Sequence, residues 1–234
     1  MIPSDLPDPA RRFLTHALVD PDVDHDAVEL DVEGRIKLGK RWLAFESTLK
    51  IEALRAFRWT ASVHGGLLRI CGHDEYADGH GEMLWRAYGL IPVMRADGPD
   101  ITHAARGRAA LEQVFLPCAL ARPEVTWSET EDGWARAAWQ LDGEDVAIEL
   151  HVDGNKHLSE VRLQRWSDAE GTPWRFVTFG ARTEGTIEGA GLRLPAQVVA
   201  GWFYGEPRFE DEGRFFDGRI TGIRAVPVSP PKAP

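Results

Sequence analysis

Residues 28–38 read VELDVEGRIKL, and this stretch decides the class of fold. Apolar side chains stand at every second position in Val28, Leu30 and Val32, and the alternation returns at Ile36 and Leu38. The positions between them are charged, apart from one glycine. A period of two residues is that of a β-strand with one buried face and one face in water, as in antiparallel sheets. The sequence therefore predicts a strand of an antiparallel sheet here.

Strand-like runs fill most of the remaining chain. Turn sequences such as Gly65-Gly66 and the DGHG segment at 78–81 separate them, which is the pattern of hairpins. We therefore expect an antiparallel meander of about a dozen strands. The further strands are expected at Trp42–Ile51, Phe57–Val63, Leu67–Tyr76, Met83–Met94, Val125–Ser128, Trp134–Leu141, Val146–His151, Leu158–Trp166, Trp174–Arg182, Gly185–Glu188, Gln197–Tyr204 and Phe216–Ile223.

Two segments have helical spacing instead. Residues 10–18 place Phe13, Leu14 and Ala17 on one side of a helix near the amino terminus. Residues 101–116 form the second, with the preceding aspartate as the expected N-cap and the following proline as the expected terminator.

Together these elements indicate an α+β fold that is mainly antiparallel β. A sheet of so many strands twists and curls, and its concave face must be covered by something. We therefore expect a large curled sheet or half-barrel with the helix at 101–116 inside it, in addition to the amino-terminal helix. Residues 1–226 are expected to form a single domain, and the proline-rich residues 227–234 a disordered tail.

The composition excludes several classes of protein. The chain has 234 residues and a formal net charge of −10, which disfavours binding to nucleic acid or to anionic lipid surfaces. No apolar run approaches the roughly 18–20 residues of a transmembrane helix, and the first residues lack the features of a secretion signal. Cys71 and Cys118 are too far apart to suggest a zinc or redox pair. We therefore expect a cytoplasmic protein without a transmembrane segment.

Arg108 and Glu112 are the most unusual pair in the chain. On a helical wheel both project from the apolar side of the helix at 101–116, and their spacing of four residues lets them touch. Charges directed at a core are costly unless they are paired. One interpretation is a structural ion pair between helix and sheet. The other is a polar anchor in a cavity, with Arg108 binding an anionic head group and Glu112 orienting it.

Nine tryptophans are the second unusual feature. Most are explained by packing between strands. On a concave sheet, however, several indoles would line an apolar pocket of the kind that binds small molecules. We expect Trp59, Trp85 and Trp202 to line it.

The motifs of common catalytic and metal sites are absent from the sequence. It contains no nucleophile elbow, no HExxH, no phosphate loop and no dinucleotide fingerprint. Asp74, Glu112 and Arg165 could still assemble an acid–base site in space. The segments His73–His80 and Asp20–Asp26 hold several potential ligands without the spacing of a zinc or calcium site, so we expect no metal and no cofactor.

A set of short motifs extends from one end of the chain to the other. They are LPDPARRFL at 6–14, DEYADGHG at 74–81, GPDI at 98–101, Gly107-Arg108, Glu112, FLP at 115–117, Arg165-Trp166, GEPRF at 205–209 and EGRFF at 212–216. In these motifs the sequence resembles, nearly end to end, a bacterial family of domains of unknown function. The expected fold is similar to the half-barrel of lipoprotein carriers, in which a curled sheet with an internal helix shelters acyl chains.

Three functional hypotheses follow from these observations. The leading one is a protein that binds a hydrophobic molecule, lipid-like or aromatic, with Arg108, Glu112 and Arg165 among the binding residues. The second is an enzyme that uses Glu112 with Arg108 or Arg165 for isomerisation, cyclisation or hydrolysis in the same cavity. The third is a structural or interaction domain, which requires a solid interior. The sequence leaves the ligand and the oligomeric state open.

Overall fold

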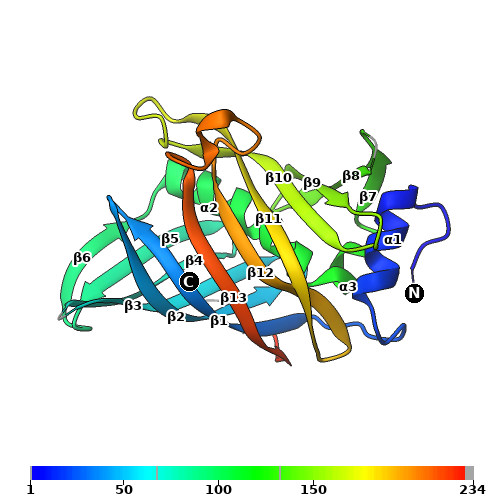
Figure 1. Ribbon diagram of the computed structural model, residues 1–234, viewed down its shortest axis with the longest axis horizontal. Coiled ribbons are helices and arrows are strands. Elements are labelled where there is room, and N and C mark those ends of the chain that lie inside the picture. Colours follow the sequence, from blue (N-terminus) through cyan, green and yellow to red (C-terminus); the bar gives the residue numbers. More distant parts are fainter. Residues whose placement is uncertain (1, 67, 132, 230–234) are drawn as a thin grey trace.

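Every strand of the described chain belongs to one antiparallel sheet (Figure 1). The structure is a computed structural model that describes residues 2–66, 68–131 and 133–229. Its strands are β1 (Ala27–Leu38), β2 (Arg41–Glu52), β3 (Ala56–Gly65), β4 (Leu68–Ala77), β5 (His80–Ala87), β6 (Ile91–Ala96), β7 (Thr126–Glu129), β8 (Trp134–Leu141), β9 (Glu144–Val152), β10 (Leu158–Ser167), β11 (Arg175–Gly189), β12 (Leu192–Trp202) and β13 (Arg214–Ala225). The α+β fold that is mainly antiparallel β is thereby confirmed.

The first and last strands meet in the middle of this sheet. The order is β6-β5-β4-β3-β2-β1-β13-β12-β11-β10-β9-β8-β7, so that β6 and β7 are the two edges. These edges follow each other in the chain, and the helical segment between them has to travel from one edge to the other. In a curled sheet the short way is across the concave side. The segment therefore packs against β3, β4, β5, β9 and β10, as expected for an internal helix (Figure 1).

The internal helical segment is interrupted rather than continuous. It consists of α2 (Pro99–Glu112), the 3₁₀ turn η1 (Gln113–Phe115) and α3 (Pro117–Leu120). Leu116 has φ −127° and ψ 65°, because the residue before a proline is disfavoured in the helical region. The helix expected at 101–116 therefore stops before Pro117 as predicted, although its last turn is a 3₁₀ turn and Pro117 begins the separate short helix α3.

Asp100, the expected N-cap of α2, does not cap the helix. Gly98 occupies the cap position and makes no side-chain cap, while the Asp100 carboxylate accepts a hydrogen bond from Trp166 Nε1 at 2.8 Å. The other two short helical elements lie near the chain ends: α1 (Asp8–Ala17), which confirms the amino-terminal helix, and η2 (Pro207–Phe209).

Two boundaries between strands differ from the expectation. Tyr88 and Gly89 both have positive φ, of 52° and 71°, and the Leu90 amide donates to the Ala87 carbonyl at 3.0 Å. This two-residue turn divides one expected strand into the hairpin β5–β6. Tyrosine is not a usual residue in the first position of such a turn, so the sequence pattern did not predict the turn at Tyr88-Gly89. Conversely, β11 continues through Gly185, where we expected a break, because its pairing with β12 is kept on both sides.

The interior is solid at one end of the sheet and hollow at the other. α1 packs against β7, β8, β9, β12 and α3. At this end Leu14, Leu120, Leu150 and Leu192 are fully buried, and each contributes about 1.5–3 kcal/mol by leaving water. The cavity described below lies under α2 at the opposite end.

Gly81 allows α2 to lie close to β5. A Cβ at this position would stand 2.6 Å from Ala105 Cβ and 2.8 Å from Thr102 Cα. The Gly81 amide also donates to Thr102 Oγ1 at 3.2 Å. The DGHG segment therefore does more than turn the chain, because its last glycine sets the height of the helix above the sheet.

The carboxy-terminal residues follow β2. The Ser229 amide donates to Glu52 Oε1 at 2.7 Å, and the Ser229 hydroxyl accepts from Lys50 Nζ at 2.8 Å. Residues 230–234 of the expected tail lie outside the described residues. The single domain over residues 1–226 and the disordered tail thus remain predictions of the sequence.

Candidate functional site

A cavity of about 510 Å³ lies between α2 and the concave face of the sheet. Its lining comes from α2, η1, strands β1–β6 and β10–β13, and the loop after β10. The structure brings all six predicted binding residues to this lining: Arg108, Glu112, Trp59, Trp85, Trp202 and Arg165. Most of the other lining side chains are apolar. A mainly apolar chamber with a small number of charged groups is the usual form of a small-molecule site.

Arg108 and Glu112 form the contact that their spacing predicted. Arg108 Nε lies 3.0 Å from Glu112 Oε1, and Arg108 Nη1 lies 2.7 Å from Asp74 Oδ2 on β4. The Arg108 side chain is 18% exposed, against 11% for Glu112 and 14% for Asp74. The pair therefore faces the sheet rather than the outer surface, and one guanidinium lies between two carboxylates.

Asp74 is the member of this cluster that the helical wheel could not supply. It lies opposite Trp59 in the β3–β4 register, and its Oδ1 accepts a hydrogen bond from Trp85 Nε1 at 2.9 Å. The guanidinium carbon of Arg108 also lies 4.8 Å from the Phe57 ring centre and 5.0 Å from that of Trp59. Arg108 is thus held by carboxylates and by aromatic faces, which contribute cation–π attraction.

Arg165 enters the cavity from β10 and forms no ion pair with a carboxylate among the described residues. Its Nε donates to the Ala104 carbonyl of α2 at 3.0 Å, and its guanidinium carbon lies 5.1 Å from the rings of both Phe179 and Trp202. The Arg165 side chain is largely enclosed by protein and belongs to the cavity lining. Burial lowers the pKa of the guanidinium to about 9, and repulsion from Arg108 adds to the effect.

Gly107 lets α2 pack against the stem of Arg165. A Cβ at Gly107 would stand 3.1 Å from Arg165 Cγ. Glycine inside a helix is unfavourable by about 1 kcal/mol relative to alanine. The close approach of Arg165 gives a physical reason for glycine at this position, which belongs to one of the motifs behind the family resemblance.

The cavity reaches the surface beside the edge strand β6. Val93 and Met94 line the cavity and are 52% and 50% exposed. Leu90 and Ile91, in the adjoining turn and strand, are also exposed. Val93 and Met94 thus give the cavity an apolar boundary with solvent at β6, and Leu90 and Ile91 extend this apolar surface outside the lining.

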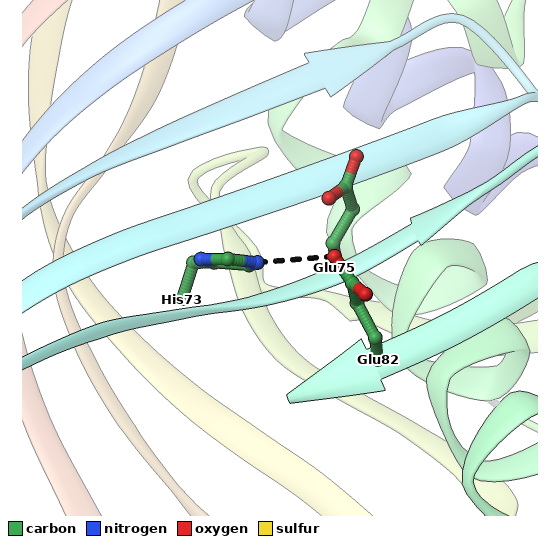
Figure 2. A group of neighbouring side chains, drawn as sticks. All are labelled: His73, Glu75 and Glu82. Carbon is green, nitrogen blue, oxygen red and sulfur yellow. Dashed lines mark hydrogen bonds and ion pairs between the residues drawn. The ribbon is translucent and has the colours of Figure 1, made fainter. Parts of the chain in front are cut away.

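A second polar group lies on β4 and β5. Figure 2 shows His73, Glu75 and Glu82, whose potential ligand atoms all lie within 4.8 Å of one another. His73 Nε2 is 3.2 Å from Glu82 Oε1, and Glu75 accepts a hydrogen bond from Arg58. Arg58 already gives Glu75 the positive charge that a metal ion would otherwise supply. The spacing of the His73–His80 segment could not reveal this group, because Glu82 comes from the neighbouring strand.

Comparison with known families decides the membership of the chain. A family described as being of unknown function, DUF6920, matches residues 4–224. The chain belongs to DUF6920. The resemblance to a family of domains of unknown function is thereby confirmed. None of the described helices of this DUF6920 chain has both the length and the apolar character of a transmembrane span.

Solved structures resemble the DUF6920 chain in fold. A LolA superfamily protein from Nitrosomonas europaea aligns with a TM-score of 0.51 and 9% identity over 94% of both chains. A DUF1329 family protein from Desulfovibrio piger aligns with a TM-score of 0.42 and 14% identity over 95% of this chain and 92% of its own. The first likeness confirms the expected half-barrel. No curated protein sequence matches the DUF6920 chain significantly.

Proposed function

We propose that this DUF6920 chain binds a hydrophobic small molecule, lipid-like or aromatic, inside the half-barrel. The observation that carries the proposal is the cavity between α2 and the sheet, with its volume of about 510 Å³ and its mainly apolar lining. Small-molecule sites typically have volumes of about 300–1,000 Å³.

A hollow of this size is costly unless a molecule occupies it. Protein interiors are ordinarily packed to the density of organic crystals. An unfilled core loses about 24 cal/mol of stabilisation per Å³ of cavity, so this cavity would cost on the order of 10 kcal/mol. That value is an upper bound because the cavity opens to the surface at β6. That amount is comparable with the whole stability of a domain, about 5–15 kcal/mol. A bound apolar molecule would recover part of it.

The lining suits a ligand with an apolar body and a polar end. The rings of Trp59 and Trp85 lie 5.5 Å apart, and the ring of Phe216 lies 6.5 Å from that of Trp59. The guanidinium carbon of Arg108 lies 5.0 Å from the ring centre of Trp59, and that of Arg165 lies 5.1 Å from the ring centre of Trp202, so both charges lie directly beside the apolar lining. The shared fold of the Nitrosomonas protein supports the architecture, and the chemistry of the lining supports the class of ligand.

The cavity bears on the hypothesis of a structural domain and leaves the hypothesis of an enzyme open. A purely structural domain requires a solid interior, and the cavity does not meet that condition. Acid–base catalysis by Glu112 with Arg108 or Arg165 remains a prediction, as does the cytoplasmic location.

Organic extraction of freshly purified protein, followed by mass spectrometry, tests the proposal. We expect a stoichiometric apolar molecule. Ala200→Phe places a ring in the cavity lining and should lose this molecule, whereas the matched control Ala147→Leu on β9 changes a residue outside the lining and should retain it. An empty wild-type preparation that also fails to bind the neutral apolar dye N-phenyl-1-naphthylamine would contradict the proposal.

A further inference from the structure

We infer that Arg165 is the head-group receptor of the cavity and that it binds a carboxylate at the end of an apolar body, as in a long-chain fatty acid. The inference rests on the proposed function, because it concerns the polar end of the same ligand. It assigns the anchor to Arg165 instead of Arg108, which the sequence favoured.

Arg165 differs from the other cations of the cavity in its partners. Among the described lining residues the cations are Lys37, Arg108 and Arg165. Arg108 is neutralised by Asp74 and Glu112, and Lys37 donates to the Asp211 carbonyl at the surface. Arg165 alone among them is enclosed without an ion-pair partner. Asp74 and Glu112 attract its charge only from beyond ion-pair distance, so an anionic group in direct contact with Arg165 would stabilise that charge further.

The Arg165 guanidinium is held in place on one side and keeps donors on the other. Its Nε is already bound to the Ala104 carbonyl, while no hydrogen bond joins its two terminal nitrogens to another described residue. The rings of Phe179 and Trp202 hold the guanidinium, and its stem lies against Gly107. A fixed guanidinium with both terminal nitrogens free matches the two oxygens of a carboxylate in a bidentate pair.

The charges near Arg165 favour a carboxylate over a phosphate as its ligand. Asp74 and Glu112 are close enough to Arg165 to act on its charge. A phosphate ester would bring about 1.5–2 negative charges beside these carboxylates, whereas a carboxylate brings a single charge and balances Arg165 alone. Repulsion from Asp74 and Glu112 therefore favours the carboxylate.

The volume of the cavity limits the size of the apolar body of the ligand. At about 30 Å³ for a group the size of a water molecule, the cavity has room for roughly 17 such groups. A methylene group is of similar size. The volume of the cavity therefore suits an acyl chain of roughly 12 to 16 carbons.

Displacement of N-phenyl-1-naphthylamine from the full chain at pH 7.5 tests the inference. The competitors are dodecanoic acid, dodecan-1-ol, methyl dodecanoate and dodecyl phosphate, used below their aggregation concentrations. We expect the acid to displace the dye from wild-type protein at a concentration at least about tenfold lower than the alcohol or the ester. In Arg165→Gln the acid and the alcohol should become equivalent, with each displacement measured relative to that variant's own affinity for the dye.

Arg162→Gln is the matched control. Arg162 lies on the same strand three residues earlier, pairs with Glu149 and Glu131, and points to the opposite face of the sheet. This variant should keep the tenfold preference for the acid. Circular dichroism establishes whether both variants fold. If Arg165→Gln does not fold, the comparison of acid, ester and alcohol on wild-type protein still tests the inference.

The outcomes separate the inference from the proposed function. Equal displacement by acid and alcohol in wild-type protein, or a preference unchanged in Arg165→Gln, would overturn the inference and leave dye binding intact. Stronger displacement by dodecyl phosphate than by the acid would overturn the assignment to a carboxylate. Failure of wild-type protein to bind the dye or any competitor would overturn the proposed function itself.

Discussion

Removal of the Arg108 guanidinium tests the charge balance beneath α2. In Arg108→Met, Asp74 and Glu112 lose ion pairs of 2.7 and 3.0 Å. Their side chains are 14% and 11% exposed, so water replaces the lost partner poorly. Breaking a buried ion pair from one side costs about 3–5 kcal/mol. We expect the free energy of unfolding to fall by about that amount, and the thermal midpoint by roughly 6–20 °C for a chain of this size.

Urea denaturation at pH 7, followed by tryptophan fluorescence, measures the change in free energy. Arg35→Met is the matched control, because Arg35 is 62% exposed in its pair with Asp217 and should contribute less than about 1 kcal/mol. The triple variant Arg108→Met, Asp74→Asn, Glu112→Gln removes the orphaned charges and should recover most of the loss. The reasoning is refuted if the triple variant is as unstable as the single one, or if Arg108→Met itself costs less than about 1 kcal/mol.

Three further variants probe packing and protonation. Gly81→Ala places a Cβ 2.6 Å from Ala105 Cβ, and we expect a loss of about 1–3 kcal/mol in urea denaturation. Gly107→Ala gains about 1 kcal/mol of helix propensity and crowds Arg165. We therefore expect little change in stability but a weaker preference for acid over alcohol in dye displacement. Burial lowers the pKa of His16 below 6.5, so the unfolded chain binds more protons and stability falls as the pH drops through 6.5. His16→Gln should flatten that part of the stability profile.

Each of these variants has an outcome that would count against its explanation. An unchanged stability of Gly81→Ala would mean that α2 tolerates a greater height above β5. A full acid preference in Gly107→Ala would separate the packing of the helix from the orientation of Arg165. An unaltered pH profile in His16→Gln would assign the loss at low pH to other groups, such as His103, whose pKa burial also lowers.

Part of the candidate site could be predicted from spacing alone. The separation of Arg108 and Glu112 by four residues is a property of any helix, so their contact was predictable before their surroundings were known. The contact with Asp74 joins residues 34 positions apart on two different elements, and no periodicity reports it. Likewise, the group formed by His73 and Glu82 depends on the register of β4 with β5.

The sequence by itself determined most of the strands, the two helical segments and the contact between Arg108 and Glu112, because these depend on the period of side chains over a few residues. Only the tertiary structure decided which charge is compensated. Arg108 and Arg165 are the same residue type, but carboxylates from β4 and α2 surround the first, while a backbone carbonyl and two aromatic rings surround the second. Electrostatic balance is set by distances of a few ångströms between elements that the sheet brings together, so it emerges only when the half-barrel closes around α2.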